Sequence, residues 1–183
     1  LTLNNGNISL DGTFNWLAGG GLTIGPLAKM YLANTLTIPA ASTLNVDGLL
    51  QINANGVITN DAGFLSLNSG GKFVIKDTTT FITSDNFIWN EGANIAIGNE
   101  GLVSLSQPFI IPDTDTLFLE SGTLLLNAGA VVTNNGSIEL NNYGNIILNE
   151  DPSFLVNGNF NWNTQGIVTL GSGLTFNVTT PLT

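Results

Sequence analysis

Carboxylates are the side chains of this sequence best suited to catalysis or metal binding, because it contains no His, Cys or Arg. Asp113 and Asp115 lie two residues apart in "PDTDT", and they share a face if this stretch is a strand. Two carboxylates on one face can hydrolyse a glycoside. With backbone carbonyls, this pair and the adjacent Glu150 and Asp151 also offer the oxygen ligands that Ca²⁺ prefers.

The other parts of an active site or a calcium loop are missing from the sequence. Without His, a Ser nucleophile has no imidazole base to activate it. Neither a D-x-[DN]-x-[DN]-G loop nor a GGxGxDxUx nonapeptide surrounds the acidic pairs. Asp in a turn before a strand is ordinary turn chemistry. The sequence therefore predicts no enzyme and no required cofactor, with calcium binding at these four carboxylates as an alternative.

A second candidate site is a Phe-x-Trp motif that occurs three times, with successive Trp residues 73 positions apart. Side chains two apart in a strand share a face, so Phe and Trp point together and the middle residue points away. Because the middle residue is Asn in two of the motifs, we expect the aromatic pairs in the core or in a contact between chains. The alternative is an exposed platform that stacks on polysaccharide. The residues are Phe14, Trp16, Phe87, Trp89, Phe160 and Trp162.

The aromatic spacing belongs to a repeat of the whole sequence. "GTFNWLAGGGLTIG" aligns with "DNFIWNEGANIAIG" at the same spacing as the Trp residues. Asp113 and Asp115 align with Ala40 and Ser42, so the acidic pair is not part of the repeat. One continuous domain, 1–183, is therefore expected. It divides into a partial unit 1–11, full units 12–84 and 85–157, and a partial unit 158–183.

The elements that position these residues are predicted to be short β-strands. Apolar runs recur at short, regular intervals, bounded by Asn, Asp, Gly or Pro, which is typical of strands and turns. The stretch 26–33, "PLAKMYLA", contains good helix formers, but its counterpart "NEGLVSLS" has strand character, so a strand is expected there too.

The spacing of the glycines predicts the number of residues in each coil. Corner glycines recur at intervals of 22 to 27 positions, which gives three coils per repeat unit. The fold class is therefore all-β, a triangular parallel β-helix (β-solenoid), and right-handed because parallel crossovers are right-handed. Stacked coils bury each other's apolar faces. Many of the 26 Asn residues should stack at corners and hydrogen-bond along the axis.

Composition excludes several classes of partner. The 183 residues contain 3 Lys and 13 acidic residues, for a net charge of −10. Such a chain cannot neutralise a row of phosphates, so it should not bind nucleic acid or an anionic membrane surface. It also lacks the run of about 20 apolar residues that membrane insertion needs.

The stretches "IPAASTLNVDGLLQINANGVITNDAGFLSLN" and "GTLLLNAGAVVTNNGSIELNNYGNIILN" resemble the repeats of secreted bacterial β-helix proteins. This group includes autotransporter-like and filamentous-haemagglutinin-like passengers, adhesin stalks, and fibre- or sheath-forming proteins. The resemblance implies an extracellular or cell-surface location and a structural or adhesive role, and it supplies no catalytic residue.

We therefore expect a non-catalytic structural protein, part of an extracellular fibre, sheath or adhesin stalk. The alternative is an adhesin that binds polysaccharide through its periodic aromatic residues. Two minor alternatives lack support. The Thr-x-Thr pattern of an ice-binding solenoid does not persist beyond 35–38 and 78–83, and a polysaccharide-degrading β-helix enzyme would need Arg or His partners. Both ends lie mid-coil without caps, so the chain should be part of a longer array or self-associate into a filament.

Glycosylation is a further expectation from short motifs. Three Asn residues stand in N-x-[ST] sequons, and two Thr residues follow Asp in a D-[ST] pattern. The candidate positions are Asn7, Asn135, Asn177, Thr78 and Thr116.

Overall fold

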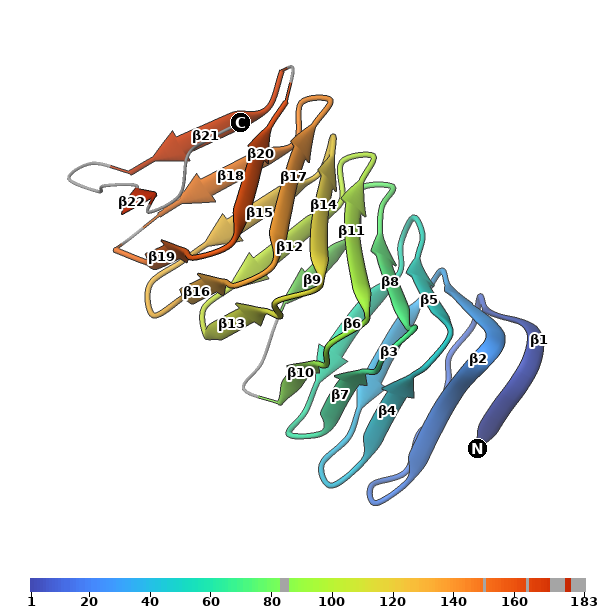
Figure 1. Ribbon diagram of the computed structural model, residues 1–183. Helices are drawn as coiled ribbons and strands as arrows, with labels where there is room; N and C mark the ends of the chain where they lie inside the picture. Colours follow the sequence, from blue (N-terminus) through green and yellow to red (C-terminus); the bar gives the residue numbers. More distant parts are fainter. Residues whose placement is uncertain (83–85, 150, 164, 172–176, 179–183) are drawn as a thin grey trace.

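The computed structural model describes residues 1–82, 86–149, 151–163, 165–171 and 177–178. These residues form parallel β-strands joined by tight turns, and no helix is found among them (Figure 1). The fold class predicted from the sequence, an all-β parallel solenoid, is confirmed.

From β3 onward, each coil places one strand on each of three faces, and strands three apart in the chain pair in parallel, except β10 and β13. Face 1 contains β5 (Leu49–Ile52), β8 (Lys72–Ile75), β11 (Asn94–Gly98), β14 (Thr116–Glu120), β17 (Ser137–Asn141) and β20 (Asn159–Trp162). Face 2 contains β3 (Thr35–Ile38), β6 (Val57–Asn60), β9 (Thr80–Ile82), β12 (Leu102–Leu105), β15 (Thr123–Leu126), β18 (Asn145–Leu148) and β21 (Ile167–Leu170). Face 3 contains β4 (Thr43–Val46), β7 (Phe64–Leu67), β10 (Phe87–Trp89), β13 (Pro108–Ile111), β16 (Val131–Asn134), β19 (Ser153–Val156) and β22 (Asn177–Val178).

The repeat unit comprises ten strands, because Thr43 in β4 corresponds to Thr116 in β14 and Phe64 in β7 to Ser137 in β17. Paired residues on adjacent coils are 20 to 23 positions apart, at or just below the short end of the expected range. Ten strands make three coils and one further strand, so the expected three coils fall one strand short. The long glycine interval 71–98 contains four strands rather than a stretched coil of three. Equivalent residues of successive units therefore lie on successive faces.

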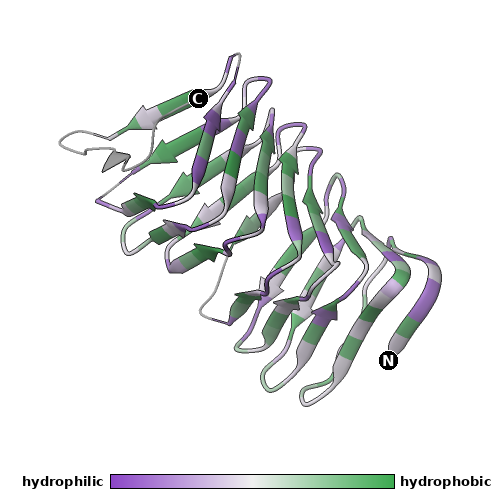
Figure 2. Ribbon diagram, in the orientation of Figure 1, coloured by the Kyte–Doolittle hydropathy of each residue, from purple (hydrophilic) through white to green (hydrophobic). Residues whose placement is uncertain are grey.

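The core is a set of apolar ladders along the axis. On face 1 the inward ladder runs through six coils without a polar residue, and every member is at most 2% exposed. Hydrophobic and hydrophilic residues alternate along the strands as the sequence predicts (Figure 2). Each buried side chain of this size contributes roughly 1.5–3 kcal/mol. The ladder is Leu50, Phe73, Ile95, Leu117, Ile138 and Phe160.

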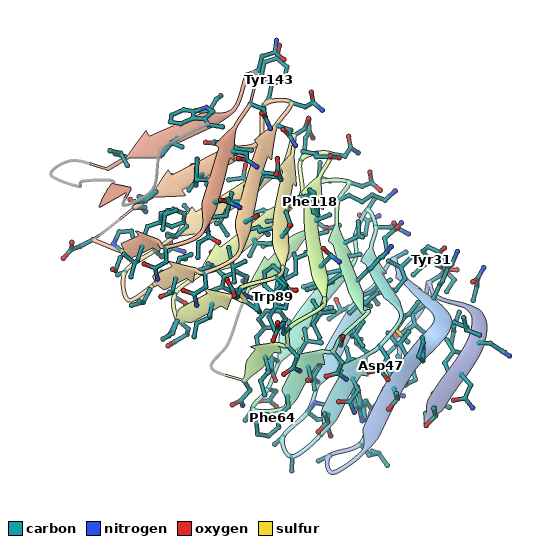
Figure 3. The ribbon with its side chains drawn as sticks, viewed as in Figure 1. Tyr31, Asp47, Phe64, Trp89, Phe118 and Tyr143 are labelled. Carbon is teal, nitrogen blue, oxygen red and sulfur yellow. The ribbon has the colours of Figure 1, made fainter. Side chains whose placement is uncertain are left out.

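Polar ladders run along the corners, which confirms the stacking predicted for asparagine. Asn68 donates to Asp47 at 2.7 Å, and Asn90 donates to Asn68 at 3.0 Å, over three successive coils (Figure 3 labels Asp47). Asn157 donates to Asn135 in the same way at 3.0 Å. These bonds add side-chain links between coils to the backbone ladders.

The N-terminal coil contains two long strands, β1 (Thr2–Leu10) and β2 (Gly21–Leu32), which pair along most of their length. One half of β2 pairs with β4 on face 3 and the other half with β5 on face 1, so these faces join in one sheet. One unit later the chain bends at Asn99 and Glu100, which have φ values of 44° and 64°. The first unit has Pro26 and Leu27 there, and proline cannot adopt positive φ. The strand expected over 26–33 is thus confirmed, and it continues straight through this corner position.

Candidate functional site

The three Phe-x-Trp motifs lie on three different faces. Residues 13–17 line a groove with Asn34, Thr35 and Thr37, at the edge of face 2. Trp89 belongs to β10 on face 3, and Trp162 belongs to β20 on face 1. This arrangement follows from the ten-strand unit, because each repeat moves the motif by one face. The three Trp side chains therefore do not form a row along one surface.

The Trp side chains close the corners that follow them. Trp89 donates its indole N–H to the carbonyl of Ala93 at 3.4 Å, and Trp162 donates to that of Gly166 at 2.8 Å. Trp89 is 9% exposed and lies in the core (Figure 3), whereas Trp162 is 39% exposed. Trp16 is half-buried, beside Gly20.

The partner of the Trp ring differs between units. Phe14 and Trp16 meet edge to face with ring centroids 6.3 Å apart, and Phe160 and Trp162 do the same at 6.4 Å. In the middle unit, Trp89 meets Phe109 from the next coil at 5.7 Å. All six aromatic residues are thus engaged with neighbouring rings.

Asp113 and Asp115 point into different surroundings. Asp113 is exposed, whereas Asp115 is only 3% exposed. The assumption that they share a strand face fails, because both lie in the turn before β14. Asp115 Oδ1 accepts hydrogen bonds from the Gly92 N–H at 2.7 Å and the Thr114 hydroxyl at 3.3 Å.

Asp115, on the next coil, therefore stabilises the corner that follows Trp89. Ser42 holds the equivalent corner one unit earlier, where its hydroxyl accepts from the N–H of Gly20, the counterpart of Ala93, at 3.2 Å. This shared role was not predicted from the sequence because Asp and Ser differ chemically, although their alignment in the repeat was a usable signal.

The carboxylates in the described part of the chain do not cluster into a metal-binding site. No group of three Asp, Glu, His or Cys side chains placed to hold an ion is found in the described residues. Asp151 is exposed at a turn, and Glu150 lies outside the described residues. Most described acidic residues lie at corners, and Glu139, inside β17, is bonded by Asn161 and Asn163.

The candidate glycosylation positions differ in access. Asn7 in β1 and Thr78 at a corner are exposed. Asn135 accepts the hydrogen bond from Asn157, and Thr116 is half-buried in β14. Asn177 lies in β22, where side chains are outside the described part.

Face 3 is interrupted between β10 and β13. These strands lie on adjacent coils but belong to different sheets, and no backbone hydrogen bond joins them in the described part of the chain. Residues of both strands line a groove. Phe87 and Phe109 bridge it from inside, with stacked rings 5.8 Å apart. We call this interruption seam 2.

An equivalent interruption, seam 1, lies one unit earlier. Residues 13–17 and β3 line its groove, and they correspond to the two walls of seam 2 shifted by one repeat unit. No ladder joins residues 13–17 to β3 in the described chain. The seams are thus a feature of the repeat. Pro108 at the start of β13 was a sequence signal for an unpaired edge, because proline cannot donate to a ladder.

Comparison with family models, curated protein sequences and solved structures found no match to this chain. No helix in the described residues is long and apolar enough to cross a membrane.

Proposed function

We propose that this chain is a non-catalytic structural segment of an extracellular fibre, sheath or adhesin stalk, built from stacked β-solenoid coils. The observation that carries the proposal is the uninterrupted apolar ladder on face 1 from Leu50 to Phe160. Such a ladder makes each coil the template for the next and produces a rod whose length grows with the number of units. The separation of Asp113 from Asp115 also supports a role without catalysis.

Polysaccharide adhesion fits the geometry less well. A sugar platform needs exposed ring faces, and Trp89 is in the core with its N–H bonded to Ala93. The three motifs also face three directions, so one straight glycan cannot contact them together. Saturable binding of a glycan that shifts the Trp emission would favour this alternative over the stalk.

Duplication of one repeat tests the rod. A second copy of residues 85–157 placed after residue 157 continues the sequence in register and adds ten strands. The particle should lengthen by about 16 Å, since each coil advances about 4.8 Å. Small-angle scattering or electron microscopy measures this, with an insert of the same length and scrambled sequence as the control. A wider particle of unchanged length would contradict the proposal.

The extracellular location needs a separate test. Antibodies against this chain should label intact cells of the source organism and decorate fibres or a surface layer. Labelling that requires permeabilised cells would contradict the location while leaving the rod intact.

A further inference from the structure

Seam 2 leaves main-chain groups unpaired on both of its walls. In β13, the Ile111 carbonyl accepts the Asn135 N–H, so Ile111 pairs with β16. Because main-chain groups alternate in direction along a strand, those of Pro108 and Ile110 face β10. On β10, the Asn86 carbonyl and the Asn90 N–H are bonded to β7. The main-chain groups of Phe87 and Trp89 therefore face β13, where no ladder receives them within the described residues.

Seam 1 repeats this arrangement on the wall formed by β3. We call β3 in seam 1 and β13 in seam 2 the upper walls. The carbonyls of Asn34 and Ile38 accept bonds from β6 and the residue after it, so Thr35 and Thr37 face the groove. The Thr35 N–H is satisfied by the Asn34 side chain at 2.7 Å, and its counterpart Pro108 has no N–H.

Both seams thus remove the first donor of the upper wall by different means. Among the described residues of the upper wall, the main-chain donor that still faces the groove is the Thr37 N–H in seam 1 and the Ile110 N–H in seam 2. Removal of donors is a known way to limit the growth of a sheet at an open edge. The seam therefore offers a short, defined set of pairing groups rather than an unrestricted edge.

The chemistry of seam 2 specifies an extended peptide. Unpaired N–H and C=O groups on a strand edge are complemented by another strand. The inner side is filled by the stacked rings of Phe87 and Phe109, so inward-pointing residues of the peptide must be small. Outside, Ile88 and Ile110 are 45% and 56% exposed, which favours apolar β-branched residues on that side of the peptide.

Charge distinguishes seam 2 from seam 1. Exposed Glu91 and Asp113 stand just beyond the carboxyl ends of its two strands. Their counterparts in seam 1 are Ala18 and Ala40. A basic residue at the end of the peptide complements seam 2 and not seam 1.

We propose that seam 2 binds an extended segment of a partner protein as an added parallel β-strand. The segment has small inward residues, β-branched outward residues and a basic end. Its main chain pairs with Phe87 and Trp89 on one side and with Ile110 on the other. An inserted strand requires its two neighbours to lie about 9.6 Å apart, twice the usual spacing between adjacent strands.

The test uses the full chain, 1–183, with Trp16→Phe and Trp162→Phe, so that Trp89 is the only tryptophan and can be excited selectively at 295 nm or above. The probe is an acetylated and amidated peptide of sequence GVGVGVK. We expect a saturable change in Trp89 emission. The same peptide with an N-methyl group on its central Val should bind at least tenfold more weakly, and the version ending in Glu several-fold more weakly.

Protein variants provide the matched control. Ile110→Pro removes the free donor of seam 2 and should weaken the peptide about tenfold, whereas Thr37→Pro changes the equivalent donor of seam 1 and should leave binding unchanged. If Ile110→Pro fails to fold, the N-methylated peptide decides alone. Absence of saturable binding, or equal binding of the N-methylated peptide, overturns the proposal.

Discussion

At single positions, the direction of a side chain decides what a substitution costs. Ile97 in β11 is fully buried between Ile75 and Leu119 of the adjacent coils. Its neighbour Ala96 points to the outside of the same strand and is half-buried. Because the core is a stack, an inward side chain contacts the coils on both sides.

Ile97→Asp should lower the free energy of unfolding by roughly 3–5 kcal/mol, because a buried carboxylate there would have no partner. Ala96→Asp, one residue away, should change it by less than about 1 kcal/mol. Urea denaturation followed by circular dichroism compares the two. Equal midpoints for both variants would show that the inward face is misassigned.

Corners determine where one strand of a coil ends and the next begins. The backbone conformation at a corner restricts the choice of residue more than the side-chain contacts do. Asn99 has φ of 44° in the corner between β11 and β12, and its side chain donates to Asp77 one coil below. In the first unit the equivalent corner is absent, and β2 runs straight past Pro26. One local sequence difference thus decides whether two strands stay on separate faces or merge.

Asn99→Pro should destabilise the fold by about 3 kcal/mol or more, since proline cannot adopt positive φ. Asn99→Gly keeps the backbone accessible and loses only the exposed bond to Asp77, so it should cost about 1 kcal/mol or less. Thermal unfolding separates these effects. If the glycine variant were as unstable as the proline variant, the side-chain hydrogen bond to Asp77, and not the backbone conformation, would be what stabilises this corner.

At the scale of the whole molecule, the ten-strand repeat unit is not a whole number of three-strand coils. Each unit turns equivalent residues by one face, and three units return them to the same face after ten coils. Features that recur once per unit, such as the seams, therefore follow a helical path around the rod.

A longer in-register array of these units should show an axial period of about 48 Å, ten coils of about 4.8 Å each. Fibre diffraction or electron microscopy of an array of six or more units measures it beside the inter-coil spacing. A unit of three whole coils would instead give a period of about 14 Å. That result would contradict the ten-strand unit.

The sequence by itself determined the features that arise from local physics. Alternation of apolar and polar residues placed Leu50 and Phe73 inside, and the turn residues between the runs predicted short strands. The regular spacing of the repeat predicted stacking, because repeated units without a core of their own must cover one another. Asparagine ladders such as that from Asp47 to Asn90 followed from composition and corner chemistry.

Only the tertiary structure decided how the coils meet. The sequence period counts residues and not strands, so the tenth strand of each unit was hidden within a long glycine interval. The separation of Asp113 from Asp115 depended on a turn where strand alternation does not apply. The seams depended on the spacing between coils, where the large rings of Phe87 and Phe109 stack across strands that form no ladder. Such contacts join residues about one coil apart, and local propensity carries no information on them.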